Sequence, residues 1–306
     1  MHPFTFLKKP TAFYIMIFVV MISGCTDVPS EPEAPSENTI SIAAFNIQVF
    51  GKTKAGKPEV MKILSKTIRN FDIVAIQEIR DISETALPKL LEQVNSNNIS
   101  NYAFIVSARL GRTSSKEQYA YLYNTQTLEQ IETPYVYPEP TGDPFHREPY
   151  IARFRILDNN RTFVLITVHT DPNEATQEIE ALPSVVENAQ AVFAEEEYFI
   201  VLGDLNADCR YFDEDKQSLL RSSDYFWAID NSADTTTKST DCTYDRIIFT
   251  SAVEPYFTGD SGVFRFDTEY GLTYDETVAV SDHYPVYAVF YNKIPEHSSI
   301  WKRLFG

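Results

Sequence analysis

The chain has 306 residues, of which 43% are hydrophobic and 13% aromatic, so it can bury a large core in one large domain or two ordinary ones. Its formal net charge of −17 excludes a protein that holds nucleic acid by the attraction of a broad basic surface. The acidity does not exclude a nuclease, because a site that binds divalent cations supplies its own positive charge.

The first 24 residues resemble a bacterial lipoprotein signal peptide. Lys8 and Lys9 precede an apolar run over residues 12–22, which is too short for a comfortable membrane span, and Cys25 follows soon after it. The resemblance implies cleavage before Cys25, a lipid on this cysteine, and export, with Thr26 favouring the outer membrane. An uncleaved N-terminal anchor is the alternative, and both interpretations place the remaining chain outside the cytoplasm.

The next segment and the cysteine count agree with an exported protein. Residues 25–38 consist mainly of Pro, Glu and Ser, which predicts a disordered tether between the lipid and a folded domain. If Cys25 carries the lipid, Cys209 and Cys242 remain as one candidate disulfide. Two free buried thiols are the alternative.

From Thr39 onward the sequence pattern predicts mixed α and β structure in a single domain over residues 39–292, followed by a tail over residues 293–306. Strands are predicted at residues 39–50, 71–79, 117–124, 150–156, 161–170, 197–208, 243–249 and 278–291. Helices are predicted at residues 58–70, at 83–94 with Ser83 as the N-cap, and at 174–195. Residues 39–292 show no internal repeat and no Gly-rich phosphate loop.

Several predicted strands lead into acids, amides or histidines. In α/β proteins such residues gather at one reactive edge, because each strand fixes a position and its open end admits a ligand. Taken singly, His169 or His283 is more often a structural histidine, but the whole set predicts a site. Its oxygen ligands suit Mg²⁺, Mn²⁺ or Ca²⁺ better than zinc. The set consists of Asn46, Glu78, His169, Asp204, Asn206, Asp282 and His283.

A series of motifs along the chain then points to one family. In order, they are AAFNIQVFG, IQEIRD, KEQYAYLYN, REP, TVHT, LGDLNADC, SADTTTKSTDCTYDRI and SDHYPV. Over about residues 41–290 they resemble the deoxyribonuclease I family within the endonuclease/exonuclease/phosphatase superfamily. GDxN and SDHxP alone would indicate only the superfamily, whereas the SADTT segment with its cysteine is more specific. The resemblance implies a four-layer α/β sandwich of two mixed β-sheets packed face to face, with helices outside.

The resemblance also assigns roles to residues of the site. It implies that Glu117 pairs with His169 and that Asp245 pairs with His283. It implies that Mg²⁺ or Mn²⁺ is held by Asn46, Glu78, Asp204, Asn206 and Asp282. A structural Ca²⁺ loop is matched by Asp234, Thr236 and Thr240, although Lys238 stands where the family has a small residue. The Cys209–Cys242 pair matches the family's essential disulfide.

Other matched positions concern the substrate. Arg80 corresponds to an arginine that enters the minor groove of DNA, Arg147 to one on the phosphate side, and Asn206 is also expected at the DNA. Two positions depart from the family pattern: Gln48 replaces an arginine, and Ser115 stands where a tyrosine packs on a deoxyribose. We therefore expect weaker contact with duplex DNA than in the family.

The resulting hypothesis is a metal-dependent endonuclease that hydrolyses DNA to 5′-phosphate ends. We expect a monomer with no obligate protein partner, anchored to the membrane through lipidated Cys25. His283 with Asp245 would activate water, and His169 with Glu117 would protonate the 3′ oxygen; the opposite assignment is the alternative. Two other functions stay open, a lipid or inositol phosphodiesterase of the same superfamily and a non-catalytic surface binding module.

Overall fold

The computed structural model describes residues 38–97, 99, 101–138 and 142–294. The predicted signal peptide, Cys25, the tether up to residue 37 and the tail from residue 295 lie outside the described residues and stay predictions. Among the described residues, no helix has the length and apolar character that a membrane crossing requires.

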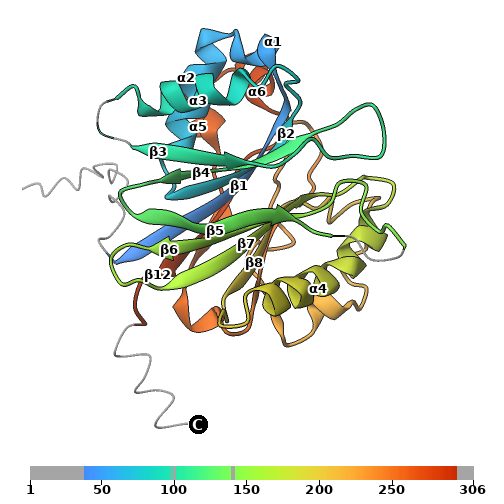
Figure 1. Ribbon diagram of the computed structural model, residues 1–306. Coiled ribbons are helices and arrows are strands. Elements are labelled where there is room, and N and C mark those ends of the chain that lie inside the picture. The colour runs from blue at the N-terminus through green and yellow to red at the C-terminus, as the bar shows by residue number, and fades with distance from the viewer. Residues whose placement is uncertain (1–37, 98, 100, 139–141, 295–306) are drawn as a thin grey trace, which may run out of the picture. The chain divides into compact units, whose positions relative to one another are not determined.

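Two mixed six-stranded sheets form the centre of the described chain (Figure 1). The first sheet, in spatial order, contains β11 (Phe257–Val263), β12 (Val286–Tyr291), β1 (Thr39–Phe50), β2 (Ile73–Ile79), β4 (Gln118–Asn124) and β3 (Tyr102–Val106). The second contains β5 (Leu128–Val136), β6 (Tyr150–Ile156), β7 (Thr162–His169), β8 (Phe199–Asp204), β10 (Asp245–Thr250) and β9 (Tyr225–Trp227). Each sheet has one parallel pair, β1 with β2 and β7 with β8.

Helices cover the outer face of each sheet (Figure 1). The first sheet is covered by α1 (Lys52–Ala55), α2 (Pro58–Ile68), α3 (Ala86–Asn95), α5 (Phe266–Tyr270) and α6 (Tyr274–Val280). The second is covered by α4 (Ala175–Val192), and two short 3₁₀ helices lie at Leu219–Arg221 and Glu254–Tyr256. The predicted four-layer α/β sandwich is confirmed.

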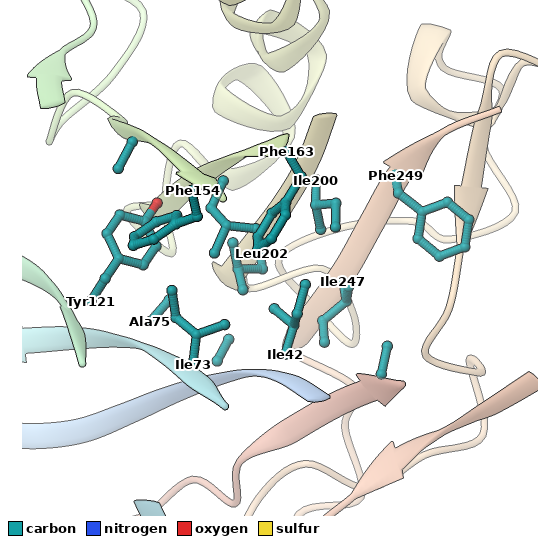
Figure 2. Close-up of a cluster of buried hydrophobic side chains, with 14 of the residues drawn as sticks. Ile42, Ile73, Ala75, Tyr121, Phe154, Phe163, Ile200, Leu202, Ile247 and Phe249 are labelled. Carbon is teal, nitrogen blue, oxygen red and sulfur yellow. The ribbon is translucent and has the colours of Figure 1, made fainter. Parts of the chain in front are cut away.

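Strand periodicity builds the layers. Along β1, Ile42 and its alternate neighbours face the second sheet, whereas Ala43, Phe45 and Ile47 face the helices. Figure 2 shows Ile42 in the core between the sheets, together with side chains of the second sheet such as Leu202. Both faces of β1 are therefore buried, which explains its almost continuous apolar sequence.

The prediction of Ser83 as the N-cap of the helix at residues 83–94 is wrong. Helix α3 begins at Ala86, and Ser83 lies in the turn before it. The Asp81 carboxylate instead accepts hydrogen bonds from the backbone N–H groups of Ser83, Thr85 and Ala86. Burial opposes the charge of Asp81, but the hydrogen bond from the Ser83 hydroxyl and these three N–H groups outweigh burial and hold the pKa of the carboxyl below its usual range.

The last predicted strand also starts too early. Residues 274–280 form α6, whose first turn has a capping box between Thr273 and Glu276, and β12 begins only at Val286. Asp282 and His283 therefore lie in the connection between α6 and β12, before a strand and not at the end of one. The valine-rich sequence VAV predicts a strand, but the N-terminal capping box starts a helix that includes it.

Helix α4 buries a carboxyl group against the second sheet. Glu178 is fully buried; its Oε1 accepts the Asp171 N–H at 2.9 Å, while its Oε2 has no hydrogen-bond partner among the described residues. Burial raises the pKa of Glu178 to about 7, against the opposing effects of the Asp171 bond and the Arg147 guanidinium. The folded protein therefore keeps a proton that the unfolded chain releases in mildly acidic solution.

This burial predicts a pH-dependent loss of stability. Because the pKa of Glu178 is higher in the folded state than in the unfolded state, folding is disfavoured as the pH rises through this range. Glu178→Gln cannot ionise, so between about pH 5 and pH 8 the variant should gain on the order of 1–3 kcal/mol relative to the parent. Urea unfolding at about pH 5 and pH 8 measures the free energy of unfolding of both proteins. Glu180→Gln is the control, because Glu180 is exposed on the same helix. Parallel pH profiles for parent and Glu178→Gln would contradict the prediction.

Candidate active site

The site lies at one edge of the sandwich, and strand direction decides which residues reach it. His169 ends β7, Asp204 ends β8, and these parallel strands pair the two residues directly. Asp245 is the first residue of β10, but β10 runs antiparallel to β8 and pairs Asp245 with Asp204. His169, Asp204 and Asp245 therefore lie side by side across three neighbouring strands of the second sheet.

The first sheet contributes in the same way. Asn46 lies in the C-terminal half of β1, and Glu78 lies near the end of β2, which is parallel to β1. Glu117 and His283 precede β4 and β12, which run antiparallel to β2 and β1, respectively. Residues that start one strand therefore meet residues that end another, and the site gathers side chains from most of the domain.

Two carboxylate–imidazole pairs dominate the site. His169 Nδ1 lies 2.9 Å from Glu117 Oε2, and His283 Nδ1 lies 2.8 Å from Asp245 Oδ2. All four side chains are buried, and each Nδ1 is engaged by a carboxylate. A carboxylate on Nδ1 fixes the ring orientation and leaves Nε2 as the reactive nitrogen. The two pairs implied by the resemblance are therefore present.

Both reactive nitrogens point at one carboxylate. Asp204 Oδ2 lies 3.4 Å from His169 Nε2 and 3.6 Å from His283 Nε2. The Asn46 amide donates to the same oxygen at 2.9 Å and to Glu78 Oε1 at 3.2 Å. Asp204 thus lies between the two imidazoles, and the Asn46 amide links it to the Glu78 carboxylate of the first sheet.

The charge of the first pair is set by its neighbours. Burial disfavours the Glu117 carboxylate, but the hydrogen bond to His169 and the guanidinium groups of Arg147 and Arg80 outweigh burial and lower the pKa of Glu117 to about 2. Burial and Arg147 lower the pKa of His169, but Glu117 and Asp204 outweigh them and raise it. The pair therefore favours an ionised carboxylate beside a basic imidazole.

The second pair differs from the first at its carboxyl group, because burial and the charge of Asp204 raise the pKa of Asp245 against the opposing effect of His283. Burial lowers the pKa of His283, but the carboxylates of Asp245 and Asp204 outweigh burial and raise it. Burial raises the pKa of Asp204, but the two histidines and the Asn46 amide lower it overall. Each histidine thus has a raised affinity for a proton, as a group needs that exchanges protons with a substrate.

The two arginines predicted to contact DNA both reach Glu117. Arg80 Nη2 lies 2.7 Å from Glu117 Oε1 and 3.2 Å from Glu78 Oε2, and its side chain is one-third exposed. Arg147 is buried; its Nη1 lies 3.5 Å from Glu117 Oε1, and it donates to the carbonyl oxygens of His169 and Thr170. Arg147 therefore braces the end of β7, and contact of either arginine with DNA stays a prediction.

Of the acids predicted to bind metal, only Asp204 belongs to the close cluster of possible ligands at this site in the described part of the chain. Ligand atoms of Asp204, Asp245 and His283 lie within 4.8 Å of one another. Two buried carboxylate oxygens, Asp245 Oδ1 and Asp282 Oδ1, have no hydrogen-bond partner among the described residues. An oxygen-rich site with unsatisfied carboxylate atoms suits Mg²⁺ or Mn²⁺. Asn206 lies beside it, because its N–H donates to Asp204 Oδ1 at 3.1 Å and its amide to the Thr170 carbonyl.

The backbone of the site has unusual conformations. Glu78 has a φ of 60° and Asn206 a φ of 48°, in the left-handed region that non-glycine residues rarely adopt. Gly203 has a φ of 144°, and a Cβ at this position would lie 2.0 Å from the Val168 carbonyl oxygen. Only glycine therefore lets β8 approach β7 closely enough to set Asp204 beside His169.

The predicted calcium loop is also brought together. The Thr236 hydroxyl donates to Asp234 Oδ1 at 2.8 Å and lies 3.1 Å from the Thr240 hydroxyl. Asp234 Oδ2 also lies 3.6 Å from Arg265 Nη2. The disulfide between Cys209 and Cys242 is present, with a Cα–Cα distance of 5.9 Å, and joins this loop to the segment that follows Asp204.

Some positioning residues escaped the sequence analysis. Ser281 donates its hydroxyl to the Asn46 carbonyl at 2.6 Å and accepts the His283 N–H at 3.1 Å. The Tyr119 hydroxyl accepts the His169 N–H at 3.0 Å. Both residues lie inside motifs noted above, Ser281 in SDHYPV and Tyr119 in KEQYAYLYN, but neither motif indicates which groups these hydroxyls contact.

Comparison with known proteins identifies the fold and the family. The pattern of the Endonuclease/Exonuclease/phosphatase family matches residues 43–283. Deoxyribonuclease-1 of Bos taurus is 35% identical over 258 residues, which cover 81% of this chain and 91% of that protein. Deoxyribonuclease-1 of Rattus norvegicus is 39% identical over 258 residues, with 81% and 90% covered. A mannosyl-6-phosphatase of Bacteroides thetaiotaomicron superposes with a TM-score of 0.54 at 14% identity, over 81% of this chain and 98% of that one.

The mannosyl-6-phosphatase shares the fold alone, since its identity is low. The family pattern, in contrast, spans both histidines and most of the described domain, and the two deoxyribonucleases match over nearly their whole length. The chain therefore belongs to the endonuclease/exonuclease/phosphatase family, as a deoxyribonuclease I-like member.

Proposed function

We propose that this protein is a divalent-metal-dependent endonuclease that hydrolyses DNA to products with 5′-phosphate ends. The observation that carries the proposal is the pair of carboxylate-bound imidazoles, whose Nε2 atoms face each other across Asp204. The similarity to Deoxyribonuclease-1 supports DNA as the substrate.

Phosphodiester hydrolysis needs a base for the attacking water and an acid for the leaving oxygen. The two histidines can supply both, because each has a carboxylate on Nδ1 and directs Nε2 at Asp204 in the middle of the site. We assign the base to His283 with Asp245 and the acid to His169 with Glu117. His169 is assigned as the acid because the positive charges of Arg80 and Arg147 keep Glu117 ionised. The ionised Glu117 can then stabilise an imidazolium at His169.

The proposed cofactor is Mg²⁺ or Mn²⁺, held by Asn46, Glu78, Asp204, Asn206 and Asp282, with Ca²⁺ in the loop of Asp234, Thr236 and Thr240. A divalent ion supplies positive charge for the phosphate oxygens, which an acidic protein otherwise lacks. The N–H₂ group of Asn46 donates to both Glu78 and Asp204 and so holds the two carboxylates next to each other.

The first test removes each imidazole separately. His169→Ala and His283→Ala should each lower the rate of plasmid nicking by about 10²–10⁴-fold, because each removes one proton-transfer group. Nicking is measured with Mg²⁺ and Ca²⁺ present, and EDTA should abolish it in the parent.

His146→Ala is the matched control, because His146 lies outside the two pairs and its Nδ1 is 3.9 Å from Asp171. Circular dichroism establishes that the variants fold. Near-parental nicking by both His169→Ala and His283→Ala would refute the assignment. Cleavage of sphingomyelin or phosphoinositides by the parent without DNA cleavage would favour a lipid phosphodiesterase instead.

The second test concerns duplex DNA. Ser115 carries no aromatic ring, and its hydroxyl accepts a hydrogen bond from Arg80 at 3.4 Å. Ser115→Tyr adds a ring beside an arginine of the site, so cleavage of duplex DNA should rise several-fold, in line with the roughly 1–3 kcal/mol that aromatic contacts contribute in single-strand complexes. Rates at subsaturating plasmid measure the change, with Ser114→Tyr as a neighbouring control. Equal rates for Ser115→Tyr and the parent would count against the altered surface.

We also propose that the protein is exported and anchored through a lipid on Cys25, with residues 25–38 as its tether. The support is the sequence of the first 25 residues, in which two lysines and an apolar run precede the cysteine. In a bacterial host, Cys25→Ser should move the protein from the membrane fraction to the soluble exported fraction. Unchanged membrane association of Cys25→Ser would favour an uncleaved anchor.

A further inference from the structure

A lysine ammonium lies next to a carboxylate of the active site. Lys238 Nζ is 2.7 Å from Asp282 Oδ2, and the other oxygen, Asp282 Oδ1, lies 4.0 Å from His283 Nε2. Asp282 is mostly buried, whereas the Lys238 side chain is half exposed. The positive charge of Lys238 therefore reaches the reaction centre from the solvent side, through the residue that immediately precedes His283.

The backbone holds Lys238 in this place. Thr237, its neighbour, donates its N–H to the Asp282 carbonyl and its hydroxyl to the Ser281 carbonyl, each at 2.9 Å. Thr236 forms a β-bridge with His283. The chain on the N-terminal side of Lys238 is thus hydrogen-bonded to residues 281–283. The backbone next to Lys238 is therefore held in place, although the side chain is half exposed.

An exposed lysine beside an acid usually forms a surface ion pair of little energetic value. Lys216 with Glu180 is such a pair, at 3.2 Å with both side chains about half exposed. Asp282 differs from Glu180, because it is mostly buried and its Oδ1 lies 4.0 Å from His283 Nε2, the nitrogen that also lies 3.6 Å from Asp204 Oδ2. At this position a positive charge acts on the same group of acids that would hold a divalent ion.

We propose that the Lys238 ammonium is a built-in cation of the reaction centre that competes with a divalent ion for the Asp282 carboxylate. The inference rests on the proposed function, which places a divalent ion at these acids. Lys238 neutralises Asp282 when no divalent ion is bound, and it repels an ion that approaches Asp282. The side chain thereby sets how much divalent cation the site needs, and a long uncharged side chain in its place removes this competition.

Binding of Mn²⁺ to the full-length protein without DNA tests the proposal. Lys238→Met keeps a long side chain but removes the charge, so the affinity of the active site for Mn²⁺ should rise on the order of tenfold, which corresponds to about 1.4 kcal/mol. Electron paramagnetic resonance of free Mn²⁺ measures the binding at low ionic strength. Lys216→Met removes the same charge from a pair outside the site and should leave the affinity unchanged.

A double-mutant cycle locates the effect. In an Asp282→Asn background the lysine has no carboxylate to compete for, so Lys238→Met should then bring no gain. Equal Mn²⁺ affinities for parent and Lys238→Met, or a gain that persists with Asp282→Asn, would overturn the proposal. Plasmid nicking by the parent is measured in parallel: nicking without the predicted gain refutes only the role of Lys238, whereas the gain without nicking refutes only the proposed function.

Discussion

The Asp204 carboxylate is a negative charge at the centre of the site, and both histidines direct Nε2 at it. Two further buried carboxylates, Glu117 and Asp245, lie behind those histidines. Buried acids are expensive unless paired charges and hydrogen bonds satisfy them. Here the two imidazoles contact the buried carboxylates, and the guanidinium groups of Arg80 and Arg147 contact Glu117. The carboxylate oxygens Asp245 Oδ1 and Asp282 Oδ1 have no hydrogen-bond partner among the described residues and could bind a cation. The surrounding structure serves largely to hold these charges together.

Strand pairing performs most of that task, and for this reason much of the site could be predicted. His169 and Asp204 each lie at the end of a strand, where an apolar run meets a polar residue, and such boundaries are visible in a sequence, whereas the role of Asp245 came only from the family resemblance. The two face-to-face sheets were implied by the family resemblance, and strands that are apolar on both faces agree with them. The strands β3, β5, β9 and β11 and the helices α1, α5 and α6 were not predicted, because most of these segments are brief and β5 buries only its first residue.

The contacts that finish the site were beyond sequence reasoning. Ser281 bonds to the carbonyl of Asn46, a residue 235 positions away, and no local pattern announces such a contact. Arg147 is an exposed residue type on average, yet it is buried here, because it forms an ion pair with the Glu117 carboxylate and the carbonyl groups of His169 and Thr170 accept its hydrogen bonds. Asp81 replaced Ser83 as the cap of α3 for a similar reason: its carboxylate can accept several N–H groups at once, whereas a hydroxyl accepts fewer.

These contacts also connect substrate binding with the chemistry. Arg80 is partly exposed but already bonded to Glu117, and Arg147 is buried against the same carboxylate. Neither charge is free to act only as an anchor for a polyanion, and the protein as a whole carries a net charge of −17. Any shift of Arg80 toward a phosphate weakens its hold on Glu117, and Glu117 orients His169. If Arg80 contacts a phosphate as predicted, attraction of the substrate and alignment of the imidazole would depend on the same guanidinium group, and cations held by the acids of the site would be the main source of attraction for a phosphodiester.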